Sequence, residues 1–320
     1  MPSEIPPVLA EVVRSGFVEG HHRGSLIVLA ADGSVELSMG DPDAPFFPRS
    51  SNKPVQAAAM LRAGLELSGP RLALASASHS GEPFHQELVR KMLAEHGLTE
   101  DLLQCPPELP LDQGEATRAT ISAGSDEAAR SRVAMNCSGK HAAMLATCGA
   151  TGWPLETYLQ PDHPLQKLIA ETLESLSGDR VSHVGTDGCG APLMAITPAG
   201  LARVFRNLAL APADSPEGRV AEAMRAHPEY VAGTRRIDTW LMSEVPGAVA
   251  KVGAESVQAA ALPDGRALAF KIHDGGNRAV GPVLARTLAL LGVDSPVLER
   301  IADSPLMGGG RKVGEVRAAF

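Results

Sequence analysis

The segment "PRSSNKPVQ" places Ser50 three residues before Lys53. On a helix these two side chains share a face, and a neutral lysine amine could accept the proton of the serine hydroxyl. The start of the helix would direct free N–H groups toward a developing oxyanion. The alternative is that Ser50 or Ser51 caps a helix and that Lys53 is solvated. Because Ser-x-x-Lys is short and common, its spacing alone does not decide between them.

Two further segments carry hydroxyl and amine groups. In "ASASHSGE", Ser76, Ser78 and Ser80 surround His79 where an apolar segment ends, which suits either a functional loop or ordinary turn chemistry. In "AFKIHDGG", Lys271 interrupts an apolar strand. A buried lysine with a lowered pKa can act as a base, whereas a lysine on an edge strand prevents aggregation.

Cysteines occur in two other unusual segments. "MNCSGKHAAMLATCG" places Cys137, Lys140 and His141 at the start of an expected helix, and "GTDGCGAP" places Asp187 and Cys189 in a glycine-rich loop. Two thiolates and a nitrogen ligand would suit zinc, although the Cys-x-x-Cys spacing of a zinc finger is absent. A pair of buried cysteines is the alternative.

Taken together, these segments resemble the class 3, or rhizobial-type, L-asparaginases of the asparaginase II family, which are related in fold to serine β-lactamases and glutaminases. The matching segments occur in the family's order and span most of the chain: "VEGHHRGSLIV", "RSSNKPVQA", "ASHSGE", "NCSGKHAAMLA", "LQPDHPLQ", "GTDGCGAP", "RAHPEYVAGTRR" and "FKIHDGG". β-Lactamase-type Ser-Asp-Asn and Lys-Thr-Gly elements are not visible, so penicillin chemistry is not expected.

The resemblance implies roles for individual residues. It implies two catalytic Ser-Lys pairs, Ser50 with Lys53 and Ser78 with Lys271. It implies a zinc ion held by Cys137, Lys140 and Cys189, and a pocket lined by Arg49, His141 and Asp187 that binds the charged groups of an amino acid. It also implies a homodimer.

The predicted function is hydrolysis of L-asparagine to L-aspartate and ammonia. Ser50 would form the acyl-enzyme, and Ser78 with Lys271 would relay protons or position water. One alternative is an amidohydrolase in which zinc-bound hydroxide attacks the amide. Another is a non-catalytic protein that binds an amino acid or zinc on the same scaffold.

The elements that must position these residues are strands near both ends and helices between them. Strands are expected within 25–40, 71–82 and 247–275 and in the last residues, with turns at 32–33 and 263–265. Helical periodicity dominates the middle, as in 165–176, and recurs in 280–291. We therefore predict an α+β fold of the β-lactamase/glutaminase type, in which an antiparallel sheet from both ends is flanked by helices. The whole chain, 1–320, would form one catalytic domain. Residues 1–54 and 246–320 would form a sheet lobe and 55–245 an α-rich lobe, with the ligand between them.

Composition excludes several classes of protein. The 320 residues are 44% hydrophobic, enough for a sizeable core, and carry a formal charge of −8 from 29 Lys and Arg against 37 Asp and Glu. The basic residues are scattered, so a nucleic-acid partner is not expected. No segment approaches the length of a membrane span, and the first residues lack the pattern of a signal peptide. We expect a cytoplasmic protein whose four cysteines are reduced.

Overall fold

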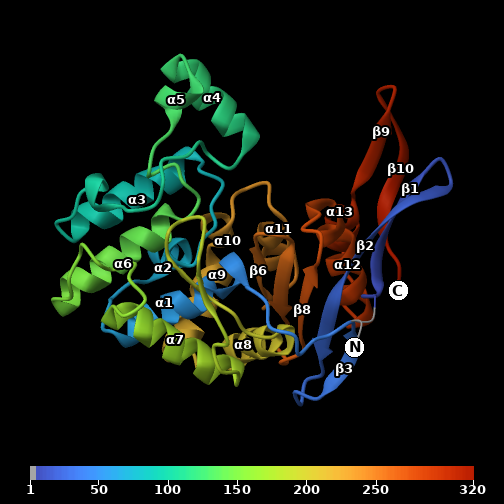
Figure 1. Cartoon of the computed structure of the whole chain (residues 1–320), viewed down its shortest axis with the longest axis horizontal. Coiled ribbons are helices and arrows are strands. Elements are labelled where there is room, and N and C mark those ends of the chain that lie inside the picture. Colours follow the sequence, from blue (N-terminus) through green and yellow to red (C-terminus); the bar gives the residue numbers. More distant parts are fainter. Residues whose placement is uncertain (1–4) are drawn as a thin grey trace.

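The computed structural model describes residues 5–320, so the first four residues of the predicted segment 1–54 lie outside it. Its strands and helices are shown in Figure 1. The strands are β1 (Val8–Arg14), β2 (Phe17–Leu29), β3 (Val35–Met39), β4 (Val184–Thr186), β5 (Pro192–Met194), β6 (Val249–Gly253), β7 (Val257–Ala261), β8 (Ala267–Ile272), β9 (Pro305–Gly308) and β10 (Arg311–Ala318).

Helices fill most of the chain between β3 and β6. The α-helices are α1 (Lys53–Arg62), α2 (Gly69–Ala75), α3 (Pro83–Glu95), α4 (Gln113–Ala123), α5 (Asp126–Ala129), α6 (Ser138–Thr151), α7 (Pro164–Ser177), α8 (Pro198–Leu210), α9 (Pro216–Ala226), α10 (Pro228–Val231), α11 (Ile237–Glu244), α12 (Val280–Leu290) and α13 (Val297–Ala302). The 3-10 helices are η1 (Arg49–Asn52), η2 (Glu100–Leu102) and η3 (Asn277–Ala279).

Both ends of the described chain build one antiparallel sheet. Its order is β6-β7-β8-β2-β1-β10-β9, and β3 pairs with β2 outside this path. Ser25 pairs with Lys271 where β2 meets β8, and Ala10 pairs with Ala318 where β1 meets β10. The predicted α+β class, with an antiparallel sheet from both chain ends, is confirmed.

Turn chemistry explains where the predicted hairpins reverse. Gly33 and Gly265 have φ values of +89° and +91°, in the left-handed region that glycine adopts without a steric penalty. The first turn joins β2 to β3 and the second joins β7 to β8. The turns predicted at 32–33 and 263–265 are therefore correct.

Amphipathic helices pack against the sheet and against one another. In α7, Leu165, Ile169 and Leu173 are buried at helical spacing, as their periodicity predicts. Helix α8 packs on β2, β7 and β8, although it belongs to the helix-rich middle of the chain. The predicted boundaries between a sheet lobe and an α-rich lobe stay a prediction.

One predicted strand is wrong. Within 71–82 the structure has the helix α2, which ends at Ala75, followed by a loop that carries Ser78. Pro70 lies in the first turn of this helix, a position where its missing N–H costs little. A short apolar run such as Leu72–Ala75 fits a buried helix as well as a buried strand, so periodicity could not decide.

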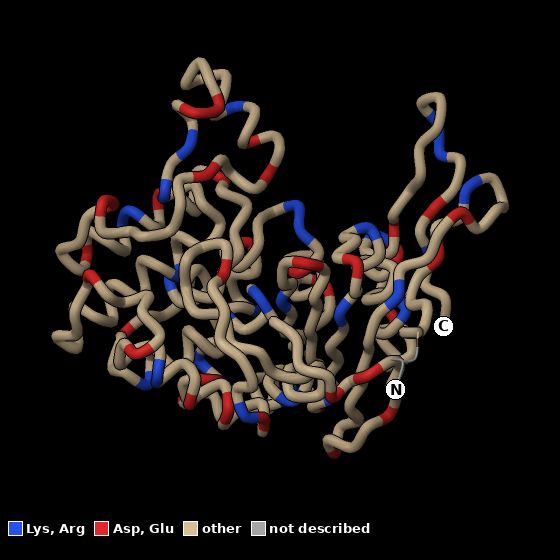
Figure 2. Tube along the Cα trace, viewed as in Figure 1, with Lys and Arg blue, Asp and Glu red and all other residues tan. Residues whose placement is uncertain are grey.

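Charged residues of both signs are interspersed along the chain (Figure 2). Within residues 5–320, none of the helices has the length and apolar character needed to cross a membrane.

Candidate active site

Ser50 lies in a strained segment that leads into α1. The preceding residue, Arg49, has a φ of +52°, an uncommon conformation for a residue with a side chain. Within residues 5–320, the N-cap residues of η1 and α1 make no capping hydrogen bond through a side chain, and the Ser51 hydroxyl donates to the Pro48 carbonyl over 2.6 Å. The geometry thus does not support the interpretation of either serine as a helix cap.

Lys53 is the first residue of α1 and is almost fully buried. Its Nζ donates to Ala77 O at 2.6 Å, to Ser78 Oγ at 2.9 Å and to Cys137 Sγ at 3.0 Å. Three acceptors match the three hydrogens of an ammonium group. The structure therefore brings Lys53 together with Ser78 and Cys137. Between Ser50 and Lys53 no side-chain hydrogen bond occurs in the part of the chain that the structure describes.

The loop after α2 holds Ser78 in place through backbone and histidine contacts. Ser78 N donates to Val231 O, and His79 N donates to Asn136 O. The His79 ring accepts from Gly81 N at Nδ1, so its Nε2 carries hydrogen and donates to Ser138 Oγ. Burial, followed by the nearby charge of His85, lowers the pKa of His79 well below its usual value. His79 is thus a neutral structural residue that fixes the turn beside Ser78.

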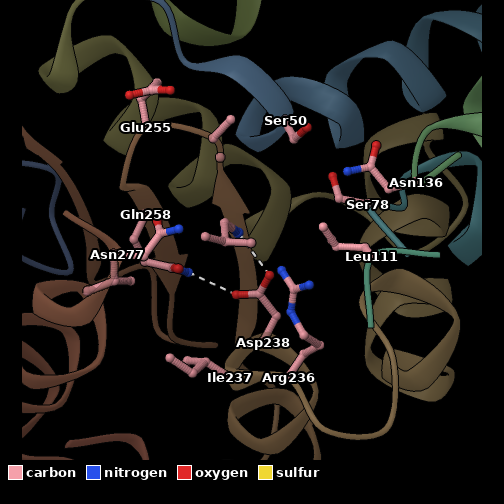
Figure 3. Close-up of a pocket in the computed structure, with 14 residues that line it drawn as sticks. Ser50, Ser78, Leu111, Asn136, Arg236, Ile237, Asp238, Glu255, Gln258 and Asn277 are labelled. Carbon is pink, nitrogen blue, oxygen red and sulfur yellow. Dashed lines mark hydrogen bonds between the residues drawn. The ribbon is translucent and has the colours of Figure 1, made fainter. Parts of the chain in front are cut away.

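Ser50 and Ser78 open into one cavity of about 500 Å³ (Figure 3). Arg236 and Asp238 project into it from the segment that begins α11, opposite the two serines (Figure 3). Its other lining residues are Leu111, Asn136, Ile237, Val252, Gly253, Ala254, Glu255, Gln258, Asn277 and Val280. The cavity thus combines two hydroxyl groups, charges of both signs and an apolar wall, as expected for a small polar ligand.

Strand β6 packs tightly against the segment that carries Ser50. A Cβ atom added at Gly253 would lie 2.4 Å from Pro48 O, closer than a side chain allows. Lys251 is two residues earlier on the same strand and therefore shares this face. It is fully buried, and its Nζ donates to Val252 O at 2.9 Å.

Lys251 is a candidate functional residue that the sequence analysis missed. Burial, reinforced by the nearby charges of Lys53 and Arg236, lowers its pKa to about 7 although Asp238 acts in the opposite direction. A lysine with such a pKa can accept a proton near neutral pH. The sequence signal for Lys251 was the Lys-x-Gly spacing in "AKVG". The glycine allows another segment to pack closely on one face of the strand, and the lysine lies on that same face.

Lys271 lies on β8, between β7 and β2, and is half-buried. The alternative that it protects an edge strand is therefore wrong. Its Nζ donates to the carbonyl of Glu255, and burial lowers its pKa. Across residues 5–320 we find no hydrogen bond between Lys271 and Ser78, so the structure does not join this second predicted pair.

The residues predicted to bind zinc do gather. Lys140 Nζ donates to Cys189 Sγ at 3.0 Å, and the Cys137 thiol donates to Asn136 Oδ1 at 3.0 Å while lying close enough to Cys189 for the two thiols to shift each other's pKa. The interaction with Cys137 and the charge of Lys140 lower the pKa of Cys189. The same interaction, together with burial, raises the pKa of Cys137. Burial acts to lower the pKa of Lys140, but the negative charge of Cys189 raises it overall.

These donor atoms fit zinc. Thiolate sulfur is a preferred zinc ligand, and a lysine amine can bind once it loses its proton. All three side chains are buried together, so an ion bound here would displace the amine proton to solvent and would itself be shielded from water. Within residues 5–320, no three His, Cys, Asp or Glu side chains are close enough to hold a metal ion by themselves.

The predicted substrate-binding residues lie beside this thiol group. Arg49 Nε donates to Asp187 Oδ1 at 2.8 Å, so their charges pair with each other. His141 is buried, and its Nδ1 lies 2.7 Å from Tyr158 Oη. Its Nε2 has no hydrogen-bond partner among the described residues. None of these three residues is among those that line the cavity of Figure 3.

Comparison with known proteins places the chain in a family. The sequence model of L-asparaginase II matches residues 10–318. The chain matches no curated protein sequence.

Among solved structures, the chain is similar to a Bacillus glutaminase, with 14% identity, a TM-score of 0.39 and coverage of 84% of this chain and 91% of the other. It is similar to EstCE1, a hydrolase with promiscuous acyltransferase activity, with 12% identity, a TM-score of 0.43 and coverage of 87% and 93%. It is also similar to Mglu in its tris and glutamate form, with 16% identity, a TM-score of 0.35 and coverage of 90% and 63%.

At these identities the similarity concerns the fold alone. The chain spans less than two thirds of the length of that Mglu chain. The family match, in contrast, extends over nearly the whole chain and agrees with the resemblance found in its motifs. The chain therefore belongs to the L-asparaginase II family.

Proposed function

We propose that the chain hydrolyses L-asparagine to L-aspartate and ammonia through a serine ester. The observation that carries the proposal is the shared cavity of Ser50 and Ser78, with Lys53 Nζ 2.9 Å from Ser78 Oγ. A nucleophilic hydroxyl, a second hydroxyl and a buried amine are the groups that serine amide hydrolysis needs. The family match supports an amide as the substrate.

In the first half of the proposed reaction, Ser50 Oγ bonds to the side-chain amide carbon. The Ser50 proton passes to the relay formed by Ser78 and the lysines, and backbone N–H groups near the start of α1 stabilise the oxyanion. The C–N bond then breaks, and the amide nitrogen takes up the proton and leaves as ammonia. In the second half, water adds to the ester and its proton enters the same relay. The C–O bond breaks, which releases aspartate and restores Ser50.

Lys53 and Lys251 are the two amines that the proposal assigns to this relay. Lys53 contacts Ser78 directly, and Lys251 carries a pKa close to neutrality on the face of β6 that packs against the Ser50 segment. Lys271 stays a candidate through the family resemblance.

Zinc at Cys137, Lys140 and Cys189 is also part of the proposal. When bound, the ion would supply a fixed positive charge beside the buried thiolates and the amine. Cys137 accepts a hydrogen bond from Lys53, so these ligands also determine where the Lys53 amine lies relative to Ser78. A homodimer and a cytoplasmic location remain predictions.

Single-serine variants test the proposal. Ser50→Ala should abolish ammonia release from asparagine, and acid-quenched wild-type protein should carry an aspartyl adduct on the peptide that contains Ser50. An adduct on the Ser78 peptide would exchange the roles of the two serines. Near wild-type turnover by both Ser50→Ala and Ser78→Ala would refute serine catalysis.

Removal of metal separates this mechanism from the metal-centred alternative. Residual turnover with a raised KM after chelation supports serine chemistry. Complete loss that only zinc restores, in protein that stays folded, supports the alternative.

A further inference from the structure

Gln258 lines the cavity and carries a buried acceptor atom without a partner among the described residues. Its side chain is fully buried, and its Nε2 donates to Asp238 Oδ1 at 3.0 Å and to Ala259 O at 3.2 Å. Its Oε1 has no partner among residues 5–320. A flipped amide would place Oε1 against two other acceptors, so these two bonds fix the orientation of the group. A buried carbonyl without a partner is unfavourable unless a ligand or water donates to it.

Asp238 adds negative charge beside this acceptor. One of its oxygens accepts from Gln258, and the other accepts from Val252 N at 2.8 Å. The carboxylate is nearly inaccessible to bulk solvent, yet it faces the cavity (Figure 3). Together, Gln258 Oε1 and the Asp238 carboxylate form a site that favours a group with several N–H donors and a positive charge.

Arg236 supplies the opposite charge two residues away. Its side chain makes no hydrogen bond or ion pair in the described part of the chain, and it projects into the cavity beside Asp238 (Figure 3). A guanidinium group without a protein partner is suited to hold a carboxylate through paired hydrogen bonds. By contrast, the charges of Arg49 and Asp187 are already paired with each other.

We propose that Arg236, Asp238 and Gln258 form a zwitterion clamp that holds the α-carboxylate and α-ammonium groups of the substrate. Arg236 binds the carboxylate, while Asp238 and Gln258 Oε1 bind the ammonium group. The clamp lies across the cavity from Ser50 and Ser78, so the side-chain amide of the same molecule points toward the hydroxyls. This inference rests on the proposed function and assigns substrate recognition to residues for which the resemblance implied no role.

The test is equilibrium binding of three small ligands by calorimetry. L-Aspartate carries both α groups, succinate lacks the ammonium group, and β-alanine lacks the α-carboxylate. Gln258→Met should weaken L-aspartate binding at least about tenfold and leave succinate binding unchanged. Arg236→Gln should weaken both L-aspartate and succinate and leave β-alanine unchanged. The control is Gln166→Met, which removes another buried glutamine whose Oε1 also lacks a partner among residues 5–320 but which lies on α7.

The outcomes separate the clamp from the proposed function. Equal effects of Gln258→Met on L-aspartate and succinate would refute the ammonium site, and unchanged binding by Arg236→Gln would refute the carboxylate site. Absence of L-aspartate binding to the wild-type chain would refute the clamp as a whole. If the ligands bind as expected but asparagine is not hydrolysed, the proposed function fails and the clamp stands. Should Gln258→Met fail to fold, Arg236→Gln still tests the clamp, because its side chain supports no other group.

Discussion

Lys53 donates a hydrogen bond to the hydroxyl of Ser78 over 2.9 Å, although Ser50 is the serine that precedes it by three residues in the sequence. The amine of the Ser-x-x-Lys segment is thus directed toward the loop after α2. The two serines consequently differ in their surroundings: Ser78 contacts a buried amine, and Ser50 follows a strained backbone and opens into the cavity.

Removal of the Ser78 hydroxyl should therefore slow catalysis without preventing folding. We expect Ser78→Ala to lower kcat by roughly 10²–10⁴-fold, as loss of a proton-transfer group does. Ammonia release measured at saturating asparagine gives this value. Ser76→Ala is the matched control, because Ser76 is buried nearby and its hydroxyl donates to the Leu72 carbonyl. Equal losses in both variants would mean that Ser78 acts only through packing.

The pKa of Lys251 predicts a pH dependence of activity. Because burial lowers that pKa to about 7 and only the neutral amine accepts a proton, kcat/KM should rise as pH increases through about 7. Lys251→Arg should remove this rising limb, since an arginine stays protonated. A pH–rate profile from pH 5.5 to 9 measures it. The solvated Lys167→Arg serves as control, and a limb that persists in Lys251→Arg would exclude Lys251 as the group that titrates.

The same residue predicts how stability changes with pH. In the unfolded chain Lys251 regains its ordinary pKa of 10.5, so between about pH 7 and 10.5 the unfolded state binds the additional proton. The free energy of unfolding therefore rises with pH in this window. Below about pH 7 the buried lysine destabilises the protein by its full amount. Lys251→Met should stabilise the protein at pH 6 by roughly 3 kcal/mol more than at pH 9. Urea unfolding at the two pH values measures the difference, and an equal effect at both would contradict the lowered pKa.

Zinc content should depend on Cys189 and Lys140. Because these side chains lie within 3.0 Å of each other and next to Cys137, loss of either should remove one of three ligands. We expect Cys189→Ser and Lys140→Met to lower zinc per chain by at least about tenfold after dialysis, measured by mass spectrometry of the metal. Cys148→Ser, another buried free cysteine on α6, should keep the wild-type content. Full zinc content in Cys189→Ser would exclude this ligand set.

A methyl group at position 253 should displace the Ser50 segment. The added Cβ of Gly253→Ala would lie 2.4 Å from Pro48 O, so β6 or η1 must shift, at a cost of about 1–3 kcal/mol. Both thermal stability and kcat should fall. In Gly20→Ala the nearest atoms lie at 3.8 Å, which makes it a control on the same sheet. Wild-type kcat in Gly253→Ala would show that the position of Ser50 does not depend on this packing.

The class of the fold could be predicted from the sequence because turns and helices leave strong signals in neighbouring residues. Asp32-Gly33 and Pro263-Asp264-Gly265 specify turns, and the periodicity of α7 and α12 specifies helices. The segment Leu72–Ala75 was predicted wrongly, because four apolar residues do not reveal which period they follow. The family was recognised correctly from the combination of several motifs, none of which was sufficient alone.

The arrangement of the site could be predicted less completely from the sequence than the fold. Lys251 and Lys271 both interrupt apolar strands, and only tertiary packing distinguishes the fully buried Lys251 from the half-buried Lys271. The partner of Lys53 depends on where a loop 25 residues later returns to α1, which spacing along a helix cannot show. Arg236 ends the matching segment "RAHPEYVAGTRR" without a predicted role, and Gln258 lies in none of the matching segments, so only the cavity reveals their place in the site.

The pairing of β2 with β8 has a consequence for how the protein folds. The pairing of Ser25 on β2 with Lys271 on β8 can form only after the whole helical region between these two residues has folded into place. Contacts between such distant parts of a chain form slowly, because a long loop must be closed first. Because β6 joins this sheet through β7 and β8, the strand that packs against the Ser50 segment takes its place late in folding. During refolding, enzymatic activity should consequently return after the helical circular dichroism signal has recovered.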